Sequence, residues 1–130
     1  MAKILVVDDT EIMRHAIELA LRKMGHEVVG VERAADAVAA ARAEPPDLAL
    51  LDLRMPGVDG AMLYGSLRAE LGSACPPVVF VTATAPELAP PSLVSLGIRP
   101  AGWVMKPFRL SELERAVCAA LGLGDAVARA

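Results

Sequence analysis

An apolar run ends in a single acid at Leu48-Ala49-Leu50-Leu51-Asp52, and this pattern is the strongest indication of the fold class. A similar run nearer the N-terminus, Ile4-Leu5-Val6-Val7, ends in two acids, Asp8 and Asp9. Strands that are buried on both faces have continuous apolar sequences, and they occur almost only in parallel sheets that helices cover. In open parallel sheets, ligands bind at the carboxyl ends of the strands. We therefore predict that the three acids meet at that edge of one sheet.

Three carboxylates at one edge repel one another unless a cation lies between them. An all-oxygen site of this kind suits Mg2+. Two more apolar runs add polar groups at the same edge, because Val78-Val79-Phe80-Val81 is followed by Thr82, and Trp103-Val104-Met105 by Lys106 and Pro107. A hydroxyl and an ammonium beside a metal are the groups that bind the oxygens of a phosphoryl group. The pattern therefore indicates phosphoryl chemistry at a metal site.

Segments with helical periodicity alternate with the apolar runs. We expect a further strand and four helices at these places: strand Val28 to Val31, and helices over Glu11 to Met24, from Ala34 to the prolines at 45–46, after the N-cap Asp59, and over Leu110 to Leu121, with Ser111 and Glu114 at capping-box spacing. Right-handed crossovers place helices on both faces of such a sheet. The sequence therefore predicts one α/β domain with a doubly wound, five-stranded parallel sheet.

Composition excludes several classes of protein. The net charge of -3 gives no basic surface for direct contact with nucleic acid. No apolar stretch approaches the roughly 18 residues of a membrane span, and the first residues contain too short an apolar segment for a signal peptide. We therefore expect a cytoplasmic protein that contacts no membrane. His15 and His26 have no partners at metal-ligand spacing, and we expect both to be exposed to solvent.

The polar residues form an ordered set, in which an acid pair, a lone acid, a hydroxyl and a Lys-Pro pair each follow their own apolar run. This set resembles the receiver domain of two-component response regulators, and the resemblance extends from Lys3 to about Leu121. It implies a flavodoxin-like fold with strand order 2-1-3-4-5. We expect a receiver domain over residues 1–121 and a short C-terminal tail over residues 122–130.

The resemblance implies a role for each residue of the set. Asp52 would be the phosphoryl acceptor, since an aspartate carboxylate is a competent nucleophile. Asp9, Asp52 and the backbone carbonyl of Arg54 would bind Mg2+ directly. Asp8 would hold a metal-bound water, because Mg2+ tends to keep several waters. Lys106 would bind a phosphoryl oxygen.

The same resemblance assigns switch and lifetime roles. Thr82 would donate a hydrogen bond to the phosphoryl group, and Trp103, three positions before the lysine, would change rotamer when that hydroxyl moves. The peptide bond before Pro107 would be cis and direct the lysine toward the acids. Arg54 and Thr84 border the path of the hydrolytic water and would tune the lifetime of the aspartyl phosphate. A solvated surface side chain is an equally good interpretation of Arg54.

The predicted function is a phosphorylation-dependent signalling switch. It would take its phosphoryl group from a histidine kinase or phosphotransfer protein and signal by binding a downstream protein target. It would act as an enzyme only on itself, through self-phosphorylation from phosphodonors and autodephosphorylation. Two alternatives stay open. One is a constitutive receiver-like scaffold, and the other a Mg2+-dependent phosphohydrolase with an aspartate nucleophile, although such enzymes carry a second acid where this chain has Arg54.

The segment before the last strand departs from the family, because it contains four prolines: Pro86, Pro90, Pro91 and Pro100. Proline is costly inside a helix but is tolerated in its first turn. We therefore expect a short fourth helix from Pro91 to Leu96, with Gly97 as its cap. Such a helix alters the output surface, so the sequence leaves the downstream target, the pathway and the oligomeric state open. It also leaves open whether the chain is a stand-alone regulator or part of a longer one.

Overall fold

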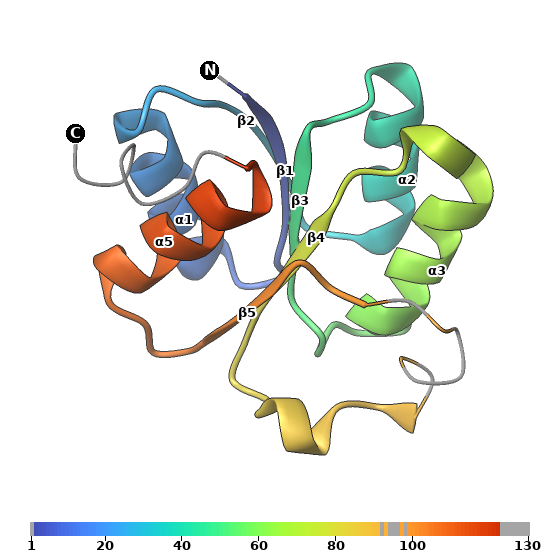
Figure 1. Cartoon of the computed structure of the whole chain (residues 1–130). Helices are drawn as coiled ribbons and strands as arrows, with labels where there is room; N and C mark the ends of the chain where they lie inside the picture. The colour runs from blue at the N-terminus through green and yellow to red at the C-terminus, as the bar shows by residue number, and fades with distance from the viewer. Residues whose placement is uncertain (1, 92, 94–96, 98, 123–130) are drawn as a thin grey trace.

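The computed structural model describes residues 2–91, 93, 97 and 99–122. Its elements, in chain order, are β1 (Lys3–Val7), α1 (Glu11–Lys23), β2 (Glu27–Val31), α2 (Ala34–Ala43), β3 (Leu48–Leu51), α3 (Gly60–Leu71), the 3-10 turn η1 (Gly72–Ala74), β4 (Val78–Thr82), the 3-10 turn η2 (Pro86–Leu88), β5 (Gly102–Met105) and α5 (Leu110–Ala120). The strands form one parallel sheet in the order β2-β1-β3-β4-β5 (Figure 1). The predicted fold class and strand order are therefore confirmed.

Helices cover both faces of the sheet, as Figure 1 shows with α1 and α5 on one side and α2 and α3 on the other. Successive residues of a strand point to opposite faces, so each strand contributes to two cores. Leu5 and Phe80 pack in the core under α2 and α3, whereas Ile4 and Leu50 pack in the core under α1 and α5. Burial of each large aliphatic side chain contributes about 1.5–3 kcal/mol. An almost purely aliphatic core therefore holds both layers in place and fixes the strand ends.

The start of α5 agrees with its prediction, but its cap does not. The capping box expected for Ser111 and Glu114 is wrong, because the helix already begins at Leu110. Instead, the Oε1 of Glu112 accepts a hydrogen bond from the backbone N–H of Arg109 at 2.8 Å. Leu110, the first residue of this helix, is 52% exposed.

The predicted exposure of the two histidines is right for His15 and wrong for His26, which is buried. Gly25, with φ of 91°, turns the chain sharply after α1. That turn brings the imidazole against the beginning of β1, where its Nδ1 accepts a hydrogen bond from the backbone N–H of Ala2 at 3.1 Å. His26 is therefore part of the packing between α1 and the sheet.

The connection between β4 and β5 begins with η2, which the sequence did not predict. The predicted helix over residues 91–96 lies largely outside the described residues, and so does the predicted tail, of which only Gly122 is described. Among the helices of the described part, none is long and apolar enough to cross a membrane.

Candidate functional site

The three predicted acids meet at the carboxyl edge of the sheet, because β1 and β3 are hydrogen-bonded neighbours. The backbone N–H of Asp52 donates to the carbonyl of Val7 at 3.1 Å, which continues the pairing past the end of β3. One carboxylate oxygen from each of Asp8, Asp9 and Asp52 lies within 4.8 Å of the others. Asp8 and Asp52 are buried, whereas Asp9 is exposed. The cluster is therefore open to solvent on the side of Asp9.

The carboxylate of Asp52 is held at both oxygens. Its Oδ1 accepts a hydrogen bond from the backbone N–H of Arg54 at 3.1 Å, and its Oδ2 lies 3.0 Å from the Nζ of Lys106. The first residue of α3, Gly60, passes so close that a Cβ built on it would overlap the carbonyl oxygen of Asp52. Glycine at this position therefore lets the acceptor loop and α3 pack against each other.

Lys106 reaches the acids from the end of β5. Its backbone N–H donates to the carbonyl of Thr82 at 2.8 Å, and the peptide bond to Pro107 is cis, the isomer expected from the motif. The Nζ also lies 2.6 Å from the Oδ2 of Asp8, so one ammonium bridges two carboxylates. The sheet thus brings together an ammonium and two carboxylates that are far apart in the sequence.

The charge state of Lys106 follows from these contacts. Burial alone would lower the pKa of the ammonium, but the hydrogen bonds and negative charges of Asp8 and Asp52 outweigh burial and raise the pKa above 10.5. Lys106 is therefore a permanent cation in the physiological pH range. It offsets part, and only part, of the negative charge of the three carboxylates.

The donor set of the cluster fits a hard divalent cation. All three side chains offer carboxylate oxygens, which are the ligands that Mg2+ prefers, and the exposed Asp9 leaves a side for the waters that Mg2+ keeps. Asp8 and Asp52 are both engaged at their two oxygens, Asp8 by the backbone N–H of Thr10 at 2.9 Å and by Lys106. The carbonyl of Arg54 as a further ligand, and the water held by Asp8, stay predictions.

The predicted switch residues are connected through Thr84. Its backbone N–H donates to the Oγ1 of Thr82 at 3.3 Å, and its carbonyl accepts from the Nε1 of Trp103 at 2.9 Å. Its own Oγ1 accepts from the Nε of Arg54 at 3.1 Å. The half-buried ring of Trp103 packs on Phe80, with ring centroids 5.3 Å apart. The sequence suggested each of the four polar residues by position, but it gave no signal that one threonine joins the other three.

The comparison with known families agrees with this geometry. The family model for the response regulator receiver domain matches residues 4–118. The chain belongs to the response regulator receiver domain family. Receiver domains are phosphorylation-dependent signalling domains of two-component systems rather than true enzymes, and they bind Mg2+ at an acidic site. The described residues of this chain include an acidic cluster, formed by Asp8, Asp9 and Asp52.

Individual relatives support the assignment. The receiver domain is 39% identical over 82 residues to protein PilH of Pseudomonas aeruginosa, which covers 63% of this chain and 68% of PilH. It is 34% identical to the DNA-binding response regulator MtrA of Mycobacterium tuberculosis over 125 residues, and this aligned stretch covers 95% of this chain. The chain spans about half the length of MtrA, 52%.

Solved structures have the same fold. The chemotaxis protein CheY4 of Vibrio cholerae superimposes with a TM-score of 0.82 at 28% identity, over 93% of this chain and 99% of CheY4. The receiver domain of the sensor histidine kinase PA1611 from Pseudomonas aeruginosa gives a TM-score of 0.81 at 28% identity, over 93% and 98% of the two chains. That structure has a magnesium ion coordinated in its active site cleft.

Proposed function

We propose that Asp52 accepts a phosphoryl group from a histidine kinase or phosphotransfer protein, and that this event changes a surface that a downstream protein binds. The observation that carries the proposal is the position of the Lys106 ammonium, which contacts both Asp8 and Asp52 at the open edge of the sheet. A structural ion pair would need only one carboxylate. An ammonium shared by two carboxylates can instead move to a phosphoryl group when Asp52 is phosphorylated and return when the phosphoryl group is lost.

The chemistry follows from the groups around Asp52. A carboxylate oxygen of Asp52 forms a bond to phosphorus while the phosphorus–nitrogen bond of the phosphohistidine donor breaks, and the released imidazole nitrogen takes up a proton. Mg2+, bound by Asp9 and Asp52, would supply positive charge for the phosphoryl oxygens. The hydrogen bond from the backbone N–H of Arg54 to Oδ1 orients the carboxylate before the reaction.

Lys106 would change partners during the reaction. In the structure its ammonium is shared by Asp8 and Asp52. Phosphorylation converts the Asp52 carboxylate into an acyl phosphate. The carboxyl group loses its negative charge, and the negative charge now lies on the phosphoryl oxygens. The ammonium then follows the negative charge to a phosphoryl oxygen, and the Thr82 hydroxyl donates to another. These two movements pull on the ends of β4 and β5, where the output surface would change.

Hydrolysis of the aspartyl phosphate would reset the switch. The side chains of Arg54 and Thr84 are hydrogen-bonded to each other, and Arg54 follows the acceptor by two residues. We assign them to the path of the attacking water, so that they set how long the phosphoryl group stays. The protein would thus be catalytic only towards itself, both in phosphorylation by small phosphodonors and in autodephosphorylation.

Intact-protein mass spectrometry tests the proposal. Incubation with phosphoramidate and Mg2+ should add a single phosphoryl group to the wild type and to Asp59→Asn, because asparagine also serves as an N-cap for α3. Asp52→Asn should stay unmodified. A histidine kinase or phosphotransfer protein from the same cell should transfer its phosphoryl group with the same dependence on Asp52. If the wild type stays unmodified by both kinds of donor, the proposal fails and the constitutive scaffold replaces it.

A further inference from the structure

Helix α1 carries a charged network at its contact with β2. Glu18 of this helix is buried, and its carboxylate lies between two guanidinium groups, 3.7 Å from the Nε of Arg14 and 3.6 Å from the Nη2 of Arg22. Burial of a carboxylate is costly unless the group is paired, and the two arginines offset this cost. Apolar packing alone does not account for an acid at this interface.

Gly30 of β2 makes the room for this carboxylate. A Cβ built on Gly30 would overlap the carboxylate of Glu18 and would lie 3.4 Å from the Cδ of Arg14. Glycine inside a strand weakens it and often marks a place where another group approaches closely. Here the approaching group is the acid of α1. The missing Cβ therefore determines where Glu18 lies and, through Glu18, where the guanidinium of Arg14 lies.

Arg14 extends from this network to the acid cluster. Its Nη1 donates a hydrogen bond to the backbone carbonyl of Asp8 at 2.9 Å, and only 11% of its side chain is exposed. The backbone N–H of Asp8 donates to the carbonyl of Val31 at 3.3 Å. Both backbone polar groups of Asp8 are therefore held, one by α1 and the other by the end of β2. The carbonyl that Arg14 binds belongs to the peptide bond between Asp8 and Asp9.

We infer that Arg14 is a positioning residue for the metal site: its guanidinium holds the peptide bond between Asp8 and Asp9 so that both carboxylates face one ion. Glu18, seated over Gly30, holds the guanidinium in turn. This inference rests on the Mg2+ site that the proposed function uses, and it adds a support for that site from the far side of α1. Partners that orient metal ligands commonly have a large effect on metal affinity.

The charge of Arg14 and its hydrogen bond act on Mg2+ in opposite directions. By charge alone, removal of the guanidinium would strengthen Mg2+ binding, because a repelling cation near the acids is gone. By position, removal would weaken Mg2+ binding, because the peptide bond between Asp8 and Asp9 is no longer held. The sign of the change in affinity therefore separates the two effects. A loss of overall stability alone would produce neither change in the folded protein.

The first experiment measures the dissociation constant of Mg2+ by NMR titration of the folded protein. The reporters are the backbone amides of Thr10 and Arg54, whose N–H groups donate to carboxylates of the cluster. Arg14→Met keeps the stem without the donor and should weaken Mg2+ binding about tenfold. Arg22→Met removes the same charge from the other side of Glu18 and should stay within about twofold of the wild type. Unchanged or tighter binding in Arg14→Met would overturn the inference.

Gly30→Ala tests the same support without any change of charge, and it also serves if Arg14→Met does not fold. The new Cβ displaces the carboxylate of Glu18, so Arg14 loses its partner and Mg2+ binding should weaken about threefold or more. When Glu18→Ala is already present, the added Cβ finds room. The double variant should therefore bind Mg2+ as Glu18→Ala alone does. Wild-type affinity in Gly30→Ala would overturn Glu18 as the support of Arg14.

A measurement without metal separates failure of this inference from failure of the proposed function. The amide proton of Thr10 donates to the carboxylate of Asp8, and its exchange with water should speed about threefold or more in Arg14→Met and in Gly30→Ala. The amide proton of Met62, in α3, is the reference for general loosening. If the wild type binds Mg2+ while both variants keep its affinity and its Thr10 exchange, the positioning role is wrong although the proposed function stands. If the wild type binds no Mg2+, the metal site of the proposed function fails, and Thr10 exchange alone decides whether Arg14 holds Asp8.

Discussion

The ammonium of Lys106 lies 3.0 Å from the Oδ2 of Asp52, although 54 positions separate the two residues in the chain. The same ammonium lies 2.6 Å from Asp8, so it partly neutralises the two buried carboxylates of the cluster. Lys106 therefore has the same electrostatic effect on these acids as a bound cation. It should stabilise the resting protein and compete with Mg2+ for the same negative charge.

Lys106→Met separates these two effects. Removal of the ammonium leaves buried carboxylates without their partner, and we expect the free energy of unfolding without Mg2+ to fall by roughly 1–3 kcal/mol. The same variant should gain more stability from Mg2+ than the wild type does, because the competing charge is gone. Thermal unfolding with and without millimolar Mg2+ measures both quantities. An equal gain in Lys106→Met and wild type would show that the ammonium and the metal do not share the cluster.

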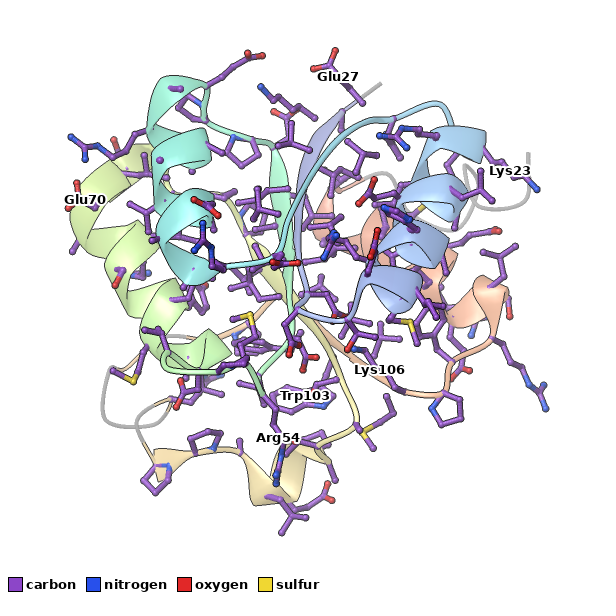
Figure 2. All side chains as sticks on the ribbon, turned by 180° about the vertical axis from the view of Figure 1, so that it is seen from behind. Lys23, Glu27, Arg54, Glu70, Trp103 and Lys106 are labelled. Atoms are coloured by element: carbon purple, nitrogen blue, oxygen red, sulfur yellow. The ribbon has the colours of Figure 1, made fainter. Side chains whose placement is uncertain are left out.

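Asp9 should control metal binding with little effect on the fold, because it is the exposed member of the cluster. Mg2+ at ten times its dissociation constant should raise the stability of the wild type by about 1.4 kcal/mol through mass action. Asp9→Asn should abolish most of this gain. Glu27→Gln removes an exposed acid at the opposite end of the sheet (Figure 2). This variant should keep the full gain in stability from Mg2+. A wild-type melting temperature that does not change when Mg2+ is added would contradict the three-acid site.

Gly60→Ala tests the close packing of α3 against the acceptor loop. Helix propensity alone predicts that alanine stabilises α3 by up to about 1 kcal/mol. The structure predicts the opposite sign, because the new Cβ would overlap the backbone of Asp52. We expect a lower melting temperature and slower phosphorylation of Asp52, whereas Ser66→Ala on the exposed side of the same helix should be neutral or slightly stabilising. A stabilised Gly60→Ala with a normal phosphorylation rate would show that this contact is not tight.

His26 should make stability depend on pH. Burial lowers the pKa of its imidazole below 6.5, so the unfolded chain binds the proton more readily. The stabilisation is therefore complete above pH 6.5 and is lost as the pH falls from 6.5 through the lower folded-state pKa. His26→Asn keeps an acceptor near Nδ1 without the titration and should flatten the fall in melting temperature between pH 7.5 and 5.5. His15→Asn, at an exposed position, should show the same change of melting temperature with pH as the wild type. If His26→Asn also shows the wild-type change, this role of His26 is ruled out.

The fold and the acid cluster were predictable because both depend on local patterns. An apolar run that ends in an acid determines where Asp52 lies once the strands are parallel, and the same holds for Asp8 and Lys106. No side-chain rotamer has to be known for these placements. The cap formed by Asp59 was predictable for the same reason, since capping is decided within four residues.

The mistaken or missing predictions depend on tertiary contacts. The burial of His26 results from how α1 packs on the start of β1, which no periodicity encodes. The Ser111 capping box is an exception, because its failure is local: the Glu112 carboxylate accepts from the backbone N–H of Arg109, which places the N-cap two residues before Ser111. The bond between Arg54 and Thr84 joins residues 30 positions apart through a long exposed side chain, whose direction the sequence leaves free.

Fluorescence of Trp103 tests whether the chemistry at Asp52 is coupled to the surface of the protein. Beryllofluoride with Mg2+ imitates the phosphoryl group and should change the emission of this only tryptophan relative to Mg2+ alone. Thr82→Ala should still accept a phosphoryl group at Asp52 but lose most of the emission change, because the hydroxyl that draws β4 toward the phosphoryl group is gone. A wild-type emission that does not respond, or an equal response in Thr82→Ala, would contradict a switch that runs from Asp52 through Thr82 to Trp103.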